Sequence, residues 1–286
     1  MLELDSRKLT PIVSQALAED RGAGDVTSRL TVDPSLQARG DFRAKADLVL
    51  AGWPVVAETF RILSDGFASR AFVGEGDRVA RGSLLGTVRG PALLLLGGER
   101  VALNFLQRCS GIATLTRAMV RAVEGTGITV LDTRKTTPGL RFLEKYAVAT
   151  GGGKNHRFGL YDGILIKENH IRAAGGIQSA VSRIRSAPGP AQRIEVEVSD
   201  LQELEEALRV GAEAVLLDNM TPGQVRECVA RTRGRAVLEV SGGIDLHNIR
   251  DYAVTGVDFI SVGALTHSAT AADISLELQL VNPREQ

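Results

Sequence analysis

The chain has 286 residues, a formal net charge of zero and 44% apolar residues. The neutral total argues against a basic nucleic-acid-binding surface, and no apolar run approaches the roughly 20 residues of a membrane helix. The first residues lack a continuous apolar core, so we expect no secretory signal. The length favours two domains. Cys109 and Cys228 stand at no metal-ligand spacing and indicate buried thiols in a reducing cytoplasm.

The first hundred residues predict a mixed domain of helices and strands. Residues 11–30 have the spacing of an amphipathic helix that ends in the turn EDRGAGDVTS, and residues 38–51 alternate as in a half-exposed strand. A short helix is expected over residues 54–63, followed by two strands within residues 68–90. The turn between those strands, GEGDRVARGS, resembles that of lipoyl domains. It lacks the lysine that such domains modify, so we interpret it as structural sheet.

A long helix is expected over residues 97–124, with Gly111 as a joint. Beyond it, apolar β-branched runs alternate with helical segments, and this pattern predicts parallel strands covered by helices. Six runs are visible where a complete barrel has eight. They are ITVLDT (128–133), GILIK (163–167), IEVEV (194–198), AVLLD (214–218), AVLEV (236–240) and VDFISV (257–262).

The predicted fold is therefore α/β, with an N-terminal α/β sandwich domain and an open or reduced (β/α) barrel of about six parallel strands. We place the sandwich domain at residues 1–108, so that it includes the start of the long helix. The barrel follows at residues 109–268. Residues 269–286 are expected to form a last helix, over residues 269–281, that returns toward the N-terminal domain.

Positive charge is concentrated in the middle of the chain. Residues 131–172 hold eight Lys and Arg against four Asp and Glu, although the whole chain is neutral. Parallel barrels gather functional groups where strands end and loops begin. The predicted strand ends carry cations, acids and glycine turns, and the GGGKN loop could bring His156 and Arg157 to the same place. The strand-end residues are Arg134, Lys135, Lys167, Glu197, Asp218, Ser241, Gly242, Gly243 and Gly263.

The residue types indicate two anionic ligands. Two separated acids, Glu197 and Asp218, suit Mg²⁺ together with a phosphorylated substrate. Guanidinium and ammonium groups suit a small polycarboxylate. Glycine turns after the last two strands expose N–H groups that can bind a phosphate. The roles of His170 and His267 stay open at this point.

Long motifs resemble the quinolinate phosphoribosyltransferase family over almost the whole chain. The motifs are EDRGAGDVTS (19–28), GERVALNFLQRCSGIAT (98–114), LDTRKTTPGLRFLEKYAV (131–148), GGGKNHRFGLYDGILIKENHI (151–171), IEVEV (194–198), VLLDNM (215–220), LEVSGGI (238–244) and DFISVGALTHS (258–268). The resemblance implies transfer of phosphoribosyl from phosphoribosyl pyrophosphate to quinolinate, with loss of CO₂ and pyrophosphate, in the synthesis of NAD.

The resemblance also implies residue roles. Lys135, Lys167, Glu197 and Asp218 would be catalytic, and Glu197 and Asp218 would hold the Mg²⁺ that accompanies phosphoribosyl pyrophosphate, directly or through substrate and water. Lys135 and Lys167 would also contact that substrate, and Ser241, Gly242, Gly243, Val262, Gly263 and Ala264 would bind its 5-phosphate. Quinolinate would be held by Thr133, Arg134, Lys135, His156, Arg157 and Lys167, with Arg100 reaching in from the partner subunit of a homodimer. Assembly beyond that dimer stays open.

Four other functions are compatible with parts of the sequence. A molybdenum-transport paralogue would alter the TRKT and NHR motifs, which are intact here. Nicotinate phosphoribosyltransferase handles one carboxylate, and the density of cations favours two. A Schiff-base aldolase would need Lys167 as a neutral amine. A non-catalytic anion-binding protein would not explain two acids beside phosphate-type turns.

Overall fold

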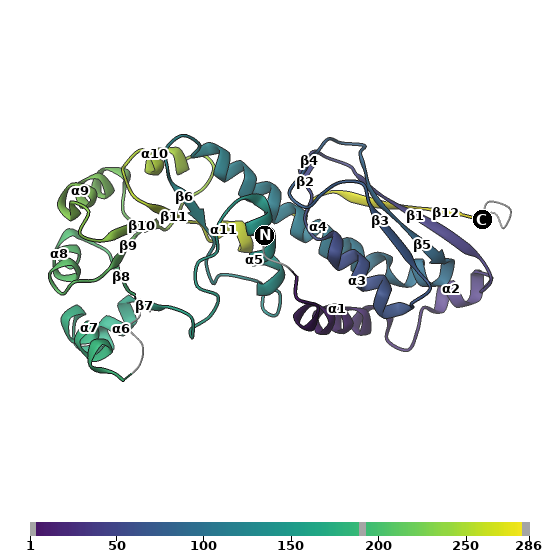
Figure 1. Ribbon diagram of the computed structural model, residues 1–286, viewed down its shortest axis with the longest axis horizontal. Coiled ribbons are helices and arrows are strands. Elements are labelled where there is room, and N and C mark those ends of the chain that lie inside the picture. The colour runs from purple at the N-terminus through teal and green to yellow at the C-terminus, as the bar shows by residue number, and fades with distance from the viewer. Residues whose placement is uncertain (1–3, 189–192, 282–286) are drawn as a thin grey trace. The chain divides into compact units, whose positions relative to one another are not determined.

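The computed structural model describes residues 4–188 and 193–281, which form two compact units (Figure 1). The first unit contains the described residues up to Arg117, together with Thr137–Gly152 and the described residues from Ser268 onward. The second unit contains Ala118–Thr136 and Gly153–His267. The predicted boundary between residues 108 and 109 falls inside one continuous helix, α4 (Ala92–Ala122), as expected for a domain that includes the start of the long helix, and the two units divide this helix after Arg117.

The first unit is an antiparallel sheet covered by helices, which confirms the predicted α/β sandwich. Its sheet has the order β12-β1-β5-β3, and β2 and β4 form a separate two-stranded ladder. The strands are β1 (Gln37–Ala44), β2 (Leu48–Val49), β3 (Ala68–Ala71), β4 (Arg78–Val79), β5 (Leu84–Pro91) and β12 (Ile274–Leu280). The helices are α1 (Ser6–Arg21), α2 (Val26–Thr31), α3 (Trp53–Leu63), α5 (Arg141–Gly151) and most of α4.

Aromatic and aliphatic side chains from the sheet and the helices form the core of this unit. Phe42 of β1 and Phe60 of α3 are fully buried, as are Leu85 of β5 and Leu106 of α4. The rings of Phe42 and Trp53 meet edge to face with their centroids 5.4 Å apart. Such a pair adds about 1 kcal/mol to the free energy of burial, so it helps to fix α3 against the sheet.

The predicted final helix is wrong, because the segment forms strand β12. This strand pairs antiparallel with β1, from Ala38 opposite Leu280 to Ala44 opposite Ile274. Ile274 is buried, and Leu276 and Leu278 pack against the same core. The alternation of apolar and polar residues in ISLELQL matches the period of a strand, and the unpaired edge of β1 outweighs the helix propensity of Leu and Glu.

Gly111 is not the joint that the sequence suggested, because α4 runs through it without interruption. The glycine permits a close approach instead. A β-carbon at this position would lie 2.0 Å from the carbonyl oxygen of Thr270, in the segment that leads into β12. The absence of a side chain therefore lets the C-terminal segment cross the helix.

The second unit is the predicted open barrel. Its six parallel strands have the order β6-β11-β10-β9-β8-β7, and helices α7, α8 and α9 lie along their outer side (Figure 1). The strands are β6 (Thr129–Leu131), β7 (Ile164–Ile166), β8 (Ile194–Val198), β9 (Ala214–Asp218), β10 (Val237–Ser241) and β11 (Phe259–Ser261). The helices are α6 (Glu168–Ala174), α7 (Ile177–Ser186), α8 (Leu201–Arg209), α9 (Pro222–Thr232), α10 (Ile249–Ala253) and α11 (Ala264–His267).

The opening of the barrel lies between its edge strands, β6 and β7. Lys154 occupies the free edge of β6, where it forms a parallel bridge with Leu131. Its N–H donates to Val130 and its carbonyl accepts from Asp132. The loop between α5 and β7 is thus held beside the sheet. Within the described residues, no helix is both long enough and apolar enough to cross a bilayer.

We expect Gly111→Ala to destabilise the first unit, because the new methyl group would overlap the carbonyl oxygen of Thr270. The overlap should cost about 1–3 kcal/mol and lower the midpoint of thermal unfolding measured by circular dichroism. Gly97→Ala is the matched control, since its β-carbon meets only the flexible end of Arg21 at 3.4 Å. An equal response of both variants would contradict this account of the crossing.

Candidate active site

A cavity of about 330 Å³ opens at the carboxyl ends of the barrel strands. Its volume lies in the range of pockets for small ligands. Every residue that lines it belongs to the second unit. They are Thr133, Arg134, Lys135, His156, Arg157, Leu165, Lys167, Glu197, Leu216, Asp218, Glu239, Ser241 and Ser261. The structure thus brings together all of the cations and acids that the sequence predicted for this part of the chain.

Strand β6 places the first cations. The chain leaves β6 through Asp132, which is fully buried, and the next residues form a tight turn in which the N–H of Lys135 donates to Thr133 Oγ1 at 3.0 Å. Thr266 Oγ1 donates to the carbonyl of Lys135 at 2.8 Å. The turn is therefore fixed at both ends, and it holds Arg134 and Lys135 at the rim of the cavity.

The buried carboxylate of Asp132 also fixes the loop that carries His156. It accepts hydrogen bonds from Asn155 Nδ2 at 2.6 Å and from the N–H of His156 at 2.8 Å. The next residue, Arg157, donates from Nη1 to the carbonyl of Gly163 at 2.9 Å. Burial, followed by the charge of nearby Arg134, lowers the pKa of Arg157. Two guanidinium groups that repel each other are suited to a ligand with two negative charges.

Lys167 follows β7 and forms an ion pair with Glu197 of β8. It is also the N-cap residue of α6, and its N–H donates to His170 Nδ1 at 3.0 Å. This bond answers the open question about His170, which caps the helix and is absent from the lining of the cavity. Because β7 and β8 are neighbours, the ammonium and the carboxylate end on the same side of the sheet.

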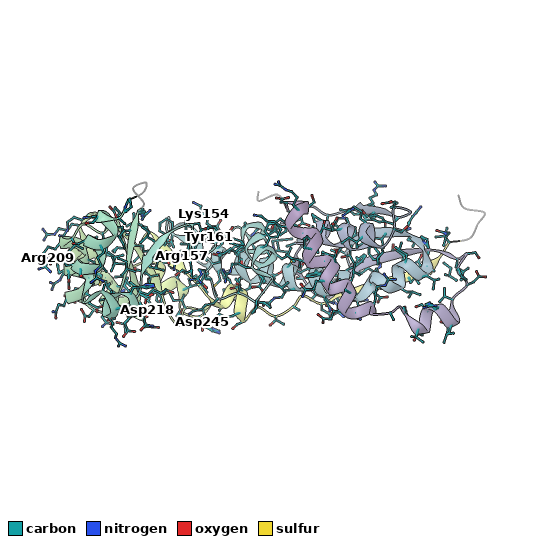
Figure 2. All side chains as sticks on the ribbon, turned by 90° about the horizontal axis from the view of Figure 1, so that it is seen from below. Lys154, Arg157, Tyr161, Arg209, Asp218 and Asp245 are labelled. Atoms are coloured by element: carbon teal, nitrogen blue, oxygen red, sulfur yellow. The ribbon has the colours of Figure 1, made fainter. Side chains whose placement is uncertain are left out.

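Asp218 is the last residue of β9 and accepts from Asn219 Nδ2 at 2.7 Å. Burial, followed by the charge of Glu197, raises its pKa. Asn219 has a positive φ of 55°, and its N–H donates to the carbonyl of Ser241 at 2.9 Å. A β-carbon on Gly242 would lie 2.2 Å from Asn219 Oδ1, so glycine is required where the two strand ends meet. In Figure 2, Arg209 is labelled at the far left of this unit, and Asp218 and Arg157 are labelled to the right of it.

The two glycine turns follow neighbouring strands, because Ser241 of β10 lies opposite Ser261 of β11. Gly242 and Gly243 both have positive φ values, of 102° and 60°. In the second turn the N–H of Val262 donates to the carbonyl of Leu131 at 2.9 Å. That N–H belongs to the sheet, so a phosphate at this turn would be bound by Gly263 and Ala264.

The structure also shows where two further residues lie: Arg100, which was predicted for the site, and His267, whose role was open. Arg100 lies on α4 in the first unit, where its side chain is exposed, and it is not among the residues that line the cavity. His267 ends α11, and a β-carbon on Gly263 would lie 3.2 Å from its Nε2 and 3.0 Å from Lys135 Cδ. His267 therefore lies close to the aliphatic part of the Lys135 side chain.

Sequence reasoning did not assign Glu239, which lies in the middle of β10 and is 3% exposed. Burial, followed by the charge of Glu195, raises its pKa to about 7. The sequence does offer a sign of this residue, which is an acid inside the apolar run AVLEV. Burying a charged side chain inside a barrel costs free energy unless a partner or a function offsets it.

The open barrel and its cavity define a class of α/β-barrel enzymes that bind anionic substrates at the carboxyl ends of the strands. Comparison with family models narrows this class. Residues 112–277 match the C-terminal domain of quinolinate phosphoribosyl transferase, and residues 25–110 match its N-terminal domain. The chain belongs to the quinolinate phosphoribosyltransferase family.

Individual relatives agree with this placement. The chain is 43% identical over 275 residues to a probable nicotinate-nucleotide pyrophosphorylase [carboxylating] of Bacillus subtilis, covering 96% of this chain and 95% of the relative. It is 39% identical to quinolinate phosphoribosyltransferase [decarboxylating] 1b of Nicotiana tabacum, covering 94% and 82%. The solved structure of the nicotinate-nucleotide pyrophosphorylase from Francisella tularensis matches with a TM-score of 0.92 at 39% identity, covering 97% of this chain and 98% of that chain.

We expect Glu239→Gln to change how stability depends on pH. The pKa of Glu239 is raised from 4.5 to about 7, so the folded protein binds this proton more tightly than the unfolded chain does. The stabilisation from that proton is complete below pH 4.5 and is lost as the pH rises through 7. The stability of the wild type relative to Glu239→Gln should fall by about 2–3 kcal/mol between pH 5 and pH 8.

Urea unfolding at several pH values measures this difference. Glu205→Gln is the matched control, because Glu205 is a half-exposed acid on the outer helix α8. A stability difference that stays constant across the pH range would show that Glu239 is ionised throughout.

Proposed function

We propose that this chain joins quinolinate to the ribose of 5-phosphoribosyl 1-pyrophosphate, and that CO₂ and pyrophosphate are released as nicotinate mononucleotide forms for NAD synthesis. The names of the relatives suggest the pyridine substrate, the phosphoribosyl transfer and the loss of CO₂. One observation carries the proposal for this chain. A group of cations and two separated carboxylates line one cavity at the ends of neighbouring strands.

The basic side of the cavity fits quinolinate, which has carboxylates on adjacent carbons of a pyridine ring. Arg134 and Arg157 would each pair with a carboxylate, and their mutual repulsion would be relieved by the dianion. Lys135 and Lys167 would add charge, and Thr133 and His156 line the same wall. Nicotinate has one carboxylate and would leave part of this set unpaired, which weakens binding.

The acidic side fits the sugar pyrophosphate. Glu197 is the penultimate residue of β8 and Asp218 is the last residue of the neighbouring strand β9, and the raised pKa of Asp218 reflects burial beside a second carboxylate. Such a donor set suits Mg²⁺, which would neutralise negative charge on the pyrophosphate when bound. We assign Glu197 and Asp218 to hold this ion, directly or through water and substrate. The turns at Ser241–Gly243 and Gly263–Ala264 would hold the 5-phosphate.

The chemistry requires little proton transfer from the protein. The pyridine nitrogen attacks C1 of the ribose, and the bond to pyrophosphate breaks with its electron pair leaving on oxygen. The positive ring nitrogen then stabilises the electron pair left at C2 when CO₂ departs. A proton from water binds to this electron pair, so that hydrogen takes the place of the lost carboxylate. Lys135 and Lys167 would stabilise the departing phosphate charge, while the arginines hold the ring in line.

The aldolase alternative is not favoured by the geometry. A Schiff-base lysine must present a neutral amine to its substrate. The ammonium of Lys167 is instead ion-paired with Glu197. The two acids and the phosphate-type turns would also have no function in that reaction.

We further propose a homodimer in which Arg100 of the partner subunit completes the quinolinate pocket. Arg100 is exposed on α4 of the first unit and is not among the residues that line the cavity. A third guanidinium at the rim would give one of the two carboxylates a further cationic partner. The two buried thiols, Cys109 and Cys228, fit the reducing cytoplasm that we propose as the compartment.

The reaction itself is the direct test. Purified protein with quinolinate, phosphoribosyl pyrophosphate and Mg²⁺ should release CO₂ and form nicotinate mononucleotide, which chromatography separates. Replacing quinolinate with nicotinate, or removing Mg²⁺ with EDTA, should abolish turnover. Equal turnover of nicotinate, or no turnover of quinolinate by folded protein, would reject the proposed function.

Mixing two inactive variants tests the shared site. Arg100→Ala and Arg134→Ala should each lose turnover, because each strands a substrate carboxylate without its partner. Random subunit exchange makes half of the dimers mixed, and each mixed dimer has one complete pocket, so about one quarter of the wild-type activity should return. Arg209→Ala is the control for loss of a surface arginine. No recovery despite measured subunit exchange would show that each chain uses its own Arg100.

A further inference from the structure

Three side chains inside the barrel form a cluster, of which only His156 has been assigned to the quinolinate side of the pocket. Glu195 of β8 and Glu239 of β10 point inward from strands that flank β9. Their carboxylates face the same ring atom, His156 Nε2, at 3.3 Å and 3.6 Å. The side chains are only 14%, 4% and 15% exposed for Glu195, Glu239 and His156. We call these three residues the interior triad.

The interior triad separates two cavities. His156 and Glu239 line the candidate active site, and all three residues line a second cavity of about 300 Å³. The second cavity also touches Ile164, Ala214, Val237 and Phe259. These are the first residues of β7, β9, β10 and β11, so this cavity lies at the amino ends of the strands. The triad is therefore the floor of the active-site cavity.

The hydrogen bond at the other ring nitrogen fixes the tautomer of His156. The N–H of Arg157 donates to His156 Nδ1 at 2.7 Å. An acceptor nitrogen carries a lone pair and no proton, so the ring proton lies on Nε2. That proton points toward the two carboxylates, of which Glu195 is the nearer at 3.3 Å and Glu239 lies at 3.6 Å.

This tautomer argues against a metal ion at the triad, although the three ligand atoms lie within 4.8 Å of one another. A metal bound at Nε2 would require the neutral ring to carry its proton on Nδ1. The N–H of Arg157 already points at that atom. The cluster as built accommodates a proton between the imidazole and the acids.

We propose that Glu195 and Glu239 are positioning residues that hold the His156 ring in the quinolinate half of the pocket. The ring in turn holds the backbone of Arg157 there. This inference rests on the proposed function. The acids hold Nε2–H, the ring accepts the N–H of Arg157, and Asp132 holds the backbone of His156. The His156–Arg157 segment is thereby tied to β6, β8 and β10.

The two acids need not place two negative charges under an anionic ligand. Oε1 of Glu239 has no hydrogen-bond partner within the part of the chain that the structure describes, and it is directed at the triad. The raised pKa of Glu239, caused first by burial and then by Glu195, is consistent with a neutral carboxyl group here. One charged and one neutral acid can face the imidazole N–H while the net charge of the pocket stays positive.

Spectroscopy tests the positioning without any substrate. The chain has four histidines, so ¹⁵N-histidine labelling gives few signals, and His156→Gln identifies the one from His156. Long-range ¹H–¹⁵N spectra should show His156 as the neutral tautomer protonated at Nε2. The Nδ1-protonated form would overturn the proposal. So would a shift of this signal on adding Zn²⁺ that disappears in Glu195→Gln, since it would reveal a metal site.

Kinetics tests the consequence. Glu195→Leu and Glu239→Leu each remove a carboxyl group that faces His156 Nε2 and keep a side chain of similar size. Each should raise KM for quinolinate about tenfold. KM for phosphoribosyl pyrophosphate should change less than about twofold, because that substrate is held elsewhere. Glu195→Gln and Glu239→Gln keep an amide oxygen as acceptor and should recover most of the lost affinity. Glu205→Leu, on the outer surface, should leave both constants unchanged.

The outcomes separate this proposal from the function on which it rests. An unchanged KM for quinolinate in both folded leucine variants, or an equal rise for both substrates, would overturn the positioning role. Circular dichroism establishes that each variant is folded. If the wild type fails to convert quinolinate, the function is rejected, while the tautomer measurement still decides whether the acids hold His156.

Discussion

The register of the six-stranded parallel sheet is the constraint on which the pocket depends. Glu195 and Glu197 of β8 alternate with buried residues, and Asp218 and Ser241 lie directly opposite each other on β9 and β10. A slip of one residue in any strand would turn its polar side chains from the interior to the helix-covered face. The apolar residues that face the helices therefore determine where the acids of the site lie.

Several charged and polar groups of the pocket already face one another without any ligand. Lys167 is ion-paired with Glu197, and the acids Glu195 and Glu239 share the proton-bearing nitrogen of His156. The pKa of Arg157 is lowered and the pKa of Asp218 is raised, so the surroundings disfavour the charged form of each side chain. Both shifts would be relieved by the proposed ligands, a dicarboxylate on one side and a cation with a phosphorylated sugar on the other.

Much of this arrangement was accessible from the sequence, because it depends on period and on strand ends. The six apolar runs gave the strands, and the polar residues that follow them gave Arg134, Lys135, Lys167, Glu197 and Asp218. Glu239 was missed because it lies within a strand, and His156, which faces its carboxyl group, comes from a loop whose position only the folded structure shows. The last helix was wrong because a strand with Leu and Glu at alternate positions has high helix propensity, and pairing with β1 is visible only in three dimensions.

The place of β12 has a consequence for how the chain is made. Its partner β1 is synthesised more than two hundred residues earlier, and the barrel sequence lies between the two. During translation the barrel can leave the ribosome and fold while β1 still presents an open edge with unpaired N–H and carbonyl groups. The sandwich unit, although it comes first in the sequence, is thus the last to be completed, and a chain that stops short of Ile274 keeps a strand edge able to pair with other chains.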